Sequence, residues 1–267
     1  GINNSNVSSN IIRNMSVNSV EIEGYAYNNT FFNNTFEDIT GIAITALHVH
    51  SGNQFLDNNF ADISQQSIKL YNLTTGNTVA NNNLSINSGD VDIFSTNNTN
   101  ITGNAFVGSS IILLDATYSF IDSNTVNNGA ITDNGGSEAS TYVGNSVGGS
   151  GGTSIIDINS HRANVTDNFV TNGGANGIFV NGSNCVISSN DLMSHIYLFG
   201  GIDSNITNNN LSMTSGYAIR LKGGSHNNNI SGHNITGTAY IAIEAGVNND
   251  IENNNFTGTA INLFINP

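Results

Sequence analysis

One phrase recurs along the chain and limits what it can fold into: an apolar residue, two spacers, an asparagine, one spacer and a second apolar residue. Phe55, Asn58 and Phe60 fill the three fixed places of a typical copy. Twelve copies follow one another at spacings of 19 to 24 residues. A repeat of this length indicates a solenoid, in which each coil is one unit that packs on its neighbours.

The polar position of the phrase is asparagine in eleven copies and histidine in one. A buried amide has a donor and an acceptor, so amides stacked coil on coil can bond to the copy above and the copy below. We therefore expect a structural amide ladder in this column. Its members are Asn10, Asn34, Asn58, Asn82, Asn104, Asn124, Asn145, Asn168, Asn190, Asn209, His233 and Asn254.

A short alternating segment follows each phrase by about half a period, as in Val20–Ile22, Ile42–Ile44 and Ile112–Leu114. Alternation with period two indicates a strand with one buried face. The segments between are rich in Gly, Asn, Ser, Asp and Thr, which favour tight turns, and no stretch has a sustained helical period. The sequence therefore predicts an all-β parallel β-helix, a single domain over residues 1–267, with about twelve coils and a length of roughly 55–60 Å.

These repeats resemble the right-handed parallel β-helix proteins of the pectate-lyase-like superfamily, especially the NosD-type repeats. In character they are similar to Asn-rich archaeal and bacterial surface or adhesin-like β-helix proteins. The resemblance covers the whole chain and implies a right-handed coil. It leaves function open, because that superfamily includes lyases, hydrolases, epimerases, tailspikes and passive surface proteins.

Charge and composition exclude several classes of partner. The net charge is −14 with only five Lys and Arg residues, which argues against nucleic acid and anionic lipid as partners. No run is apolar enough to insert into a membrane, and no cofactor is expected. The lone cysteine, Cys185, is expected to be a small core residue.

Asn-x-Ser/Thr sequons are frequent, and several fall in expected turns, where an N-glycan would not disturb the core. We therefore expect an extracellular or cell-surface protein that carries glycans at some of these sites. The candidates are Asn3, Asn6, Asn14, Asn28, Asn33, Asn72, Asn83, Asn97, Asn100, Asn164, Asn181, Asn205, Asn210, Asn229, Asn234 and Asn255.

Neither end of the sequence offers an obvious cap for a terminal coil. The 13 residues from Asn254 to Pro267 and the 10 from Gly1 to Asn10 sum to 23, which lies within the internal spacing. A second copy placed head to tail would continue the coil in phase, and such a contact builds an open filament. The residues expected at this polymer interface are Ile2, Val7, Ile261, Leu263 and Ile265.

The resemblance implies that any chemistry would lie at outward strand positions, where the enzymes of that superfamily usually carry it. We expect this column to read Glu21, Ala43, Lys69, Asp92, Leu113, Thr132, Asp157, Phe179, Tyr197, Arg220, Ala242 and Asn262. Asp92 and Asp157 would be about 14 Å apart, too far for a glycosidase acid pair. Asp90, Asp92 and Asp115 are weak candidates for Ca²⁺, although solvated acids are the favoured interpretation and no metal site is predicted.

Two histidines, His48 and His50, are expected on one strand face, where a turn or surface role is favoured over a metal site. No nucleophile–base pair is evident. The favoured hypothesis is therefore a non-catalytic structural surface protein that stacks with itself into a filament or sheath. The alternative is a carbohydrate-active lyase or hydrolase, or a glycan-binding adhesin or tailspike, and outward aromatic residues such as Phe179 and Tyr197 would favour it.

Overall fold

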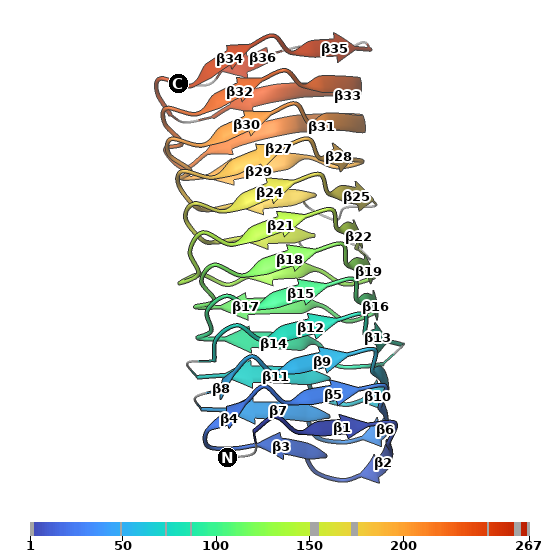
Figure 1. Cartoon of the computed structure of the whole chain (residues 1–267). Helices are drawn as coiled ribbons and strands as arrows, with labels where there is room; N and C mark the ends of the chain where they lie inside the picture. Colours follow the sequence, from blue (N-terminus) through green and yellow to red (C-terminus); the bar gives the residue numbers. More distant parts are fainter. Residues whose placement is uncertain are drawn as a thin grey trace.

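The computed structural model describes residues 3–48, 50–72, 74–85, 87–149, 155–171, 176–244, 246–258 and 263–265. Over these residues all regular structure is β-strand, wound into a single right-handed parallel β-helix (Figure 1). The N-terminal coil lies at one end of the stack and the C-terminal coil at the other. The predicted fold class is confirmed.

Each coil contributes one strand to each of three faces, and successive coils pair in parallel. The first face comprises β1 (Asn6–Ser8), β5 (Thr30–Phe32), β9 (Gln54–Leu56), β12 (Thr78–Ala80), β15 (Asn100–Thr102), β18 (Phe120–Asp122), β21 (Thr141–Val143), β24 (Asn164–Thr166), β27 (Val186–Ser188), β30 (Asn205–Thr207), β32 (Asn229–Ser231) and β34 (Asp250–Glu252). The second face comprises β2 (Ile11–Met15), β6 (Thr35–Ile39), β10 (Asn59–Ile63), β13 (Asn83–Leu84), β16 (Ala105–Val107), β19 (Thr125–Asn127), β22 (Ser146–Gly148), β25 (Phe169–Thr171), β28 (Asp191–Leu192) and β35 (Asn255–Thr257).

The third face carries the functional candidates. It comprises β3 (Val20–Ile22), β7 (Ile44–Leu47), β11 (Ile68–Tyr71), β14 (Val91–Phe94), β17 (Ile111–Leu114), β20 (Ile131–Asp133), β23 (Ile156–Ile158), β26 (Ile178–Val180), β29 (Ile196–Phe199) and β36 (Leu263–Ile265). Two long strands, β31 (Asn210–Lys222) and β33 (Asn234–Ile243), run through both the second and third faces and join them into one sheet. A short pair, β4 (Ala26–Tyr27) and β8 (His50–Ser51), lies at the remaining corner.

The asparagine column forms a continuous ladder between the first and second faces. At Asn124, Oδ1 accepts hydrogen bonds from the backbone N of Asn104 at 3.0 Å and from its Nδ2 at 2.9 Å. Nδ2 of Asn124 donates in turn to Oδ1 of Asn145 at 3.0 Å and to the carbonyl of Ile101 at 2.9 Å. The same side-chain pairing runs from Asn10 to Asn209. Every polar atom of such an amide is paired, which a buried amide requires.

Histidine replaces asparagine in one coil. There the amide-to-amide bonds end at Asn209, and the ladder continues through bonds from a backbone N to the next side chain. Nδ1 of His233 accepts from the backbone N of Asn209 at 3.1 Å, and Nε2 lies 3.0 Å from the carbonyl of Ile206. Its own backbone N donates to Oδ1 of Asn254 at 3.0 Å. One nitrogen must therefore accept while the other donates, which is the neutral imidazole. Burial agrees with this assignment, because it lowers the pKa of His233 to about 4.

A second ladder, which the sequence analysis missed, runs five residues before the first. Nδ2 of Asn29 donates to Asn53 Oδ1 at 3.0 Å, and that of Asn228 donates to Asn249 Oδ1 at 2.9 Å. In the middle coils small residues replace the amides, and buried Cys185 is one of them, its backbone N donating to Ser204 Oγ at 3.2 Å. The expectation that this cysteine is a small core residue is confirmed.

The residue before each ladder position has a left-handed backbone. Examples are Asp57 (φ 54°), Asn81 (φ 56°) and Gly103 (φ 63°), which precede Asn58, Asn82 and Asn104. Asn, Asp and Gly reach this region at the lowest cost, so the turn chemistry explains the many Asn-Asn and Asp-Asn pairs of the sequence. The turn bends the chain just as the next side chain points into the interior.

Like residues stack on like inside the coil. Phe36 and Phe60 are register partners whose ring centroids are 5.0 Å apart and nearly parallel. In the weakest coil of the sequence, the inward position of β20 is the buried carboxylate of Asp133. Tyr142 in β21 donates its hydroxyl to Asp133 Oδ2 at 2.7 Å, so this polar group is paired within the core. Burial raises the pKa of Tyr142 well above its ordinary value.

Three strands of the third face differ in phase from the sequence prediction. In β36 the register partner of Ala242 is Phe264, whereas Asn262 was expected at this place. The strand β7 begins at Ile44, so Thr45 rather than Ala43 is the register partner of Lys69. In β17, Ile111 and Leu113 point inward and Ile112 takes the outward place predicted for Leu113. The cause in β17 is a run of apolar residues, in which alternation cannot be read from hydrophobicity alone.

The first coil is paired on one side only among the described residues: β1, β2 and β3 bond to β5, β6 and β7. An apolar cavity of about 640 Å³ opens there, lined in part by Val7, Val20 and Phe31. Of the expected polymer interface, Val7 is half-buried in β1, whereas Leu263 and Ile265 are placed only as backbone in β36. Ile2 and Ile261 lie outside the described residues, as does Asn262 of the expected outward column.

Replacing Asn124 by alanine tests the ladder. The change leaves the two Asn104 donors and the Ile101 carbonyl without their partner, so we expect the free energy of unfolding to fall by about 3–5 kcal/mol. Chemical denaturation measures the loss. Asn127→Ala, an exposed asparagine in the same coil, should cost less than about 0.5 kcal/mol. Equal losses in the two variants would contradict a structural ladder.

Candidate functional site

The outward side chains of the third face form one row, because each is the register partner of the next. The row runs from Lys69 in β11 through Asp92, Ile112, Thr132 and Asp157 to the strands of the C-terminal coils. There it continues as Phe179 in β26, Tyr197 in β29, Arg220 in β31 and Ala242 in β33. The described part of this row has the predicted composition except at three places, where Thr45, Ile112 and Phe264 stand instead of Ala43, Leu113 and Asn262.

Aromatic rings cluster at the C-terminal part of the row. Phe179 and Tyr197 meet edge to face, with ring centroids 5.4 Å apart, and Tyr197 meets Phe199 at 6.2 Å. Beside them Tyr217 and Tyr240 meet at 5.0 Å. Together with the arginine that packs among them, these rings are called the aromatic–arginine surface. Its members are Phe179, Tyr197, Phe199, Tyr217, Arg220 and Tyr240.

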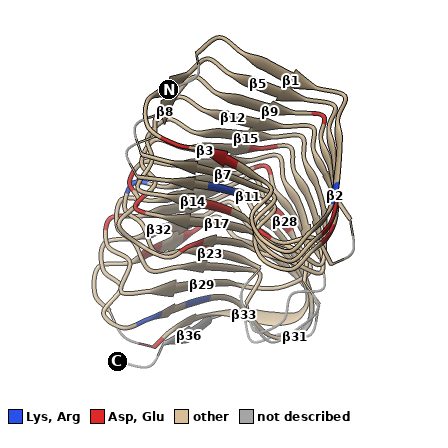
Figure 2. Ribbon diagram, turned by 90° about the horizontal axis from the view of Figure 1, so that it is seen from below, with Lys and Arg blue, Asp and Glu red and all other residues tan. Residues whose placement is uncertain are grey.

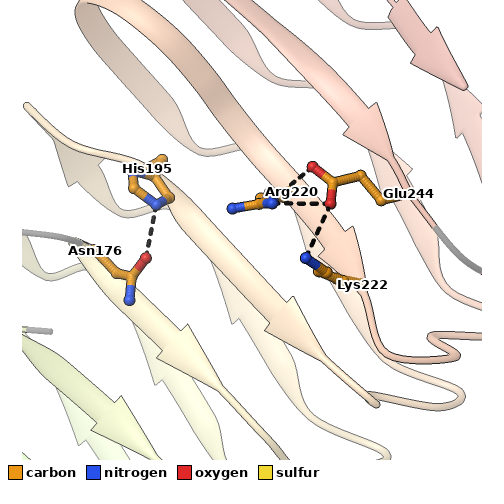
Figure 3. A network of polar contacts seen from close by, with 5 residues as sticks. All are labelled: Asn176, His195, Arg220, Lys222 and Glu244. Carbon is orange, nitrogen blue, oxygen red and sulfur yellow. Dashed lines mark hydrogen bonds and ion pairs between the residues drawn. The ribbon is translucent and has the colours of Figure 1, made fainter. Parts of the chain in front are cut away.

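Arg220 is the most constrained member of this surface. Its guanidinium carbon lies 4.6 Å from the ring centroid of Tyr217 and 5.2 Å from that of Tyr197. Nε and Nη2 donate to the two carboxylate oxygens of Glu244, each at 2.8 Å (Figure 3). A fork-to-fork pair fixes both the position and the plane of the guanidinium. The Arg220 hydrogen bonds hold the pKa of Glu244 below its usual value, so this acid stays ionised.

Two further polar groups border Arg220. Lys222 Nζ lies 3.5 Å from Glu244 Oε2, and its side chain is 46% exposed. Just before the neighbouring strand β29, His195 Nε2 lies 2.7 Å from Oδ1 of Asn176 (Figure 3). Burial, and then the charge of Arg220, lower the pKa of His195, which keeps the imidazole neutral near pH 7. The surface therefore offers apolar rings beside fixed donors and acceptors.

A smaller cluster lies at the N-terminal part of the same row. Lys69 Nζ lies 5.7 Å from the ring centroids of both Tyr71 and Phe94, and these two rings are 6.0 Å apart. The next outward side chain, Asp92, is only 5% exposed, and its Oδ1 has no hydrogen-bond partner. Burial, and then the nearby Asp90, raise the pKa of Asp92 to about 6.

The three acids considered for calcium do not lie together. Asp90 precedes β14 and its Oδ1 accepts from the backbone N of Ser110 at 2.6 Å. Asp115 follows β17, at the other end of the neighbouring strand, so it lies near Ser95 and away from Asp90. Over the described residues, no group of three or more His, Cys, Asp or Glu side chains has a metal-binding arrangement.

The two histidines of the His48–His50 pair lie on opposite sides of the chain, contrary to the expectation of one strand face. His48 is exposed with a left-handed backbone (φ 80°), whereas His50 is fully buried and hydrogen-bonds the carbonyl of Leu47. The turn before β8 reverses the direction of alternation, which the sequence spacing does not reveal. Burial lowers the pKa of His50, in keeping with a neutral core residue.

All sixteen sequon asparagines are exposed or half-exposed, and none belongs to either ladder. An attached glycan at these positions would point away from the core. Glycosylation itself stays a prediction. Within the described part of the chain, no helix is long and apolar enough to cross a membrane.

The basic residues of this acidic chain gather on the third face. Figure 2 shows basic positions on β11 and beside β29, with acidic positions between them. Lys69, Arg220 and Lys222 make up three of the chain's five cations, whereas Arg162 pairs with Glu138 elsewhere. The face therefore combines both signs of charge with the aromatic rings.

No protein-family model matches the chain, and no match was found among curated proteins. Solved structures match in fold. The A-module of mannuronan C-5 epimerase AlgE4 from Azotobacter vinelandii has a TM-score of 0.52 at 13% identity, with 96% of this chain and 78% of that chain covered. The AlgE6 A-module from the same organism gives 0.50 at 11% identity, covering 96% and 81%.

A mutant of DFA-IIIase from Arthrobacter chlorophenolicus gives a TM-score of 0.51 at 12% identity. The match covers 79% of this chain, which spans 59% of the length of that protein. At these identities the likeness shows the fold alone. The right-handed parallel β-helix that the resemblance implied is confirmed.

Replacing Asp92 by asparagine tests its buried carboxyl. Its folded pKa of about 6 lies above the ordinary 3.8, so between these values the folded protein binds more protons than the unfolded chain. Stability therefore falls as pH rises through this window, and the penalty is complete above it. We expect Asp92→Asn to be more stable at pH 7 by on the order of 1–3 kcal/mol and nearly unchanged at about pH 4.

Thermal or chemical denaturation at several pH values measures this difference. Asp167→Asn, which changes an exposed acid in a turn after β24, serves as the matched control and should change the free energy of unfolding by less than about 0.5 kcal/mol. An Asp92→Asn variant that is less stable than the parent at pH 7 would contradict the assignment.

Proposed function

We propose that this protein is an extracellular or cell-surface β-helix that binds polysaccharide on its third face, through the aromatic–arginine surface. One observation carries the proposal: Arg220 is held against the rings of Tyr197 and Tyr217 by a bidentate pair with Glu244. N-glycans at the exposed sequons are part of the proposed extracellular setting.

The chemistry of sugars fits such a surface. A pyranose ring presents a patch of C–H groups that packs on an aromatic face, and its hydroxyl or carboxylate groups bond to fixed donors and acceptors. The Arg220–Glu244 pair offers both kinds of partner, and Lys222 and His195 add further polar groups. Because Arg220 is already oriented, binding costs little side-chain entropy at this position.

The fold comparisons support a polysaccharide ligand. The AlgE4 and AlgE6 modules share this fold and are named as mannuronan epimerases, so a β-helix of this architecture is compatible with a linear polysaccharide. We propose binding without cleavage. Asp92 and Asp157 are three register steps apart, about 14 Å, which exceeds the spacing of a glycosidase acid pair.

Tyr197→Ala tests the proposal, because this ring meets Phe179, Phe199 and Arg220. Binding to a panel of soluble polysaccharides, including mannuronan and neutral mannan, is measured by affinity electrophoresis and calorimetry. We expect the affinity for the bound polysaccharide to fall by at least about tenfold. Tyr25→Ala, which removes a 64% exposed tyrosine from a turn of the first coils, is the control and should bind normally.

The parent protein binding no polysaccharide, or the two tyrosine variants binding equally well, would overturn the proposal. The same incubations are examined for shortened or unsaturated products. Their appearance would replace a binding role by the carbohydrate-active enzyme of the alternative hypothesis.

We also propose, as a second role, that the first coil stacks on a second copy of this chain. The open strand edge of β1, β2 and β3, together with the apolar cavity beside Val7, Val20 and Phe31, supports this filament hypothesis. Burying an exposed edge and an apolar cavity in one contact favours association. The occupant, a second copy, would add its own strands in phase with the ladders.

Electron microscopy and light scattering over a range of concentrations test this role. We expect rods that lengthen with concentration, and shorter particles after Val7→Lys combined with Val20→Lys, which places charge at the contact. Val17→Lys, at a side chain that is already 63% exposed, should leave the lengthening unchanged. Particles of constant length at every concentration would rule the stacking out.

A further inference from the structure

The smaller cluster on the third face, made of Lys69, Tyr71 and Phe94, resembles the aromatic–arginine surface in kind. In both, a cation lies within 6 Å of the centroids of two aromatic rings. Tyr71 is 39% exposed, so its ring is open to a ligand. This cluster is called the N-terminal aromatic cluster, and the function proposed above does not use it.

The two clusters lie on one straight row. Six register steps lead from Lys69 to Tyr197, through Asp92, Ile112, Thr132, Asp157 and Phe179. At about 4.8 Å per step the clusters are separated by about 29 Å along the helix axis. Figure 2 shows the strands that carry them, β11 and β29, on the same face. All steps are parallel pairings in the same sheet, so the row is unbroken.

Most side chains between the clusters are accessible along the row. Ile112, Thr132 and Asp157 are each half-exposed, whereas Asp92, beside Lys69, is buried at 5% exposure. The three half-exposed residues offer a short apolar patch, a hydroxyl and a carboxylate, which suit the mixed apolar and hydroxyl surface of a sugar.

We propose that the two clusters are the ends of one elongated binding surface, whose ligand is a linear pyranose polysaccharide lying parallel to the helix axis. This inference rests on the polysaccharide-binding function proposed above and names the orientation and length of its ligand. A sugar in an extended chain is about as long as one rung, so about six sugars span the two clusters. Each cluster then packs its rings against one end of that segment.

Joining two contact regions in one ligand makes the second contact intramolecular. A chain that reaches both clusters gains affinity steeply, whereas a shorter chain binds at the aromatic–arginine surface alone. The dependence of affinity on chain length is therefore the property that separates an axial ligand from one bound across the strands.

Size-fractionated oligosaccharides of about two to ten sugars test this geometry. The probes are β-1,4-linked oligomannuronates and their uncharged counterparts, β-1,4-linked manno-oligosaccharides, so the two series distinguish acidic from neutral ligands of one shape. Calorimetry measures the parent protein, Tyr71→Ala combined with Phe94→Ala, Tyr197→Ala, and the Tyr25→Ala control. Circular dichroism and melting confirm that each variant is folded.

We expect affinity in at least one series to rise by about tenfold or more once chains exceed about six sugars. The Tyr71/Phe94 double variant should lose this gain and bind short chains as the parent does. Tyr197→Ala should weaken binding at every length.

Long chains that bind no more tightly than short ones, or a double variant that keeps the full gain, would overturn the axial geometry. If affinity did not depend on chain length but Tyr197→Ala still weakened binding, the proposed function would stand. Binding that is independent of Tyr197 would remove the proposed function itself, and failure of both series to bind at any length would overturn both proposals.

Discussion

The buried amide ladder is the interaction on which the rest of this structure depends. From Asn34 to Asn190, each ladder asparagine accepts two hydrogen bonds from one coil and donates to the next, as Asn124 does between Asn104 and Asn145. A shift of one residue in any coil would leave these groups unpaired inside the core and would turn inward side chains outward. The ladder therefore fixes the register of every coil that contributes to it.

The fixed register has different consequences for the inward and the outward side chains of the coils. Inside, it stacks Phe36 on Phe60 and provides a pairing partner for a buried acid such as Asp133. Outside, it arranges side chains into rows at rung spacing, so residues far apart in sequence share one surface. Tyr197 and Arg220 meet because their strands are register partners. A row of side chains of this kind needs no loop to organise it, so it can extend over many coils.

The sequence was informative wherever one residue type had a single physical reason to recur. The ladder column and the alternating strands predicted the fold, and the adjacency of Phe179 and Tyr197 followed from them. The sequence did not predict which residues point outward where only hydrophobicity indicated the alternation, as at Leu113. It also failed where a turn of unknown length came between two strands, as at Ala43 and His50. The second ladder escaped notice because serine, alanine and cysteine replace its amides in the middle coils. The Arg220–Glu244 pair depends on side-chain placement across two coils, which no repeat pattern specifies.

The central claim is that the ladders fix the register of the coils, and disulfide cross-linking within the outward row tests it most directly. In this row, the register determines which two side chains on adjacent coils are close enough to cross-link. Thr132 and Asp157 are register partners, about 4.8 Å apart, which suits a disulfide, whereas Thr132 and Asn159 are offset by two residues. Cysteines at Thr132 and Asp157 should oxidise rapidly to one intramolecular bond, and cysteines at Thr132 and Asn159 should not. Equal cross-linking of both pairs, or preference for the offset pair, would contradict a register fixed by the ladders.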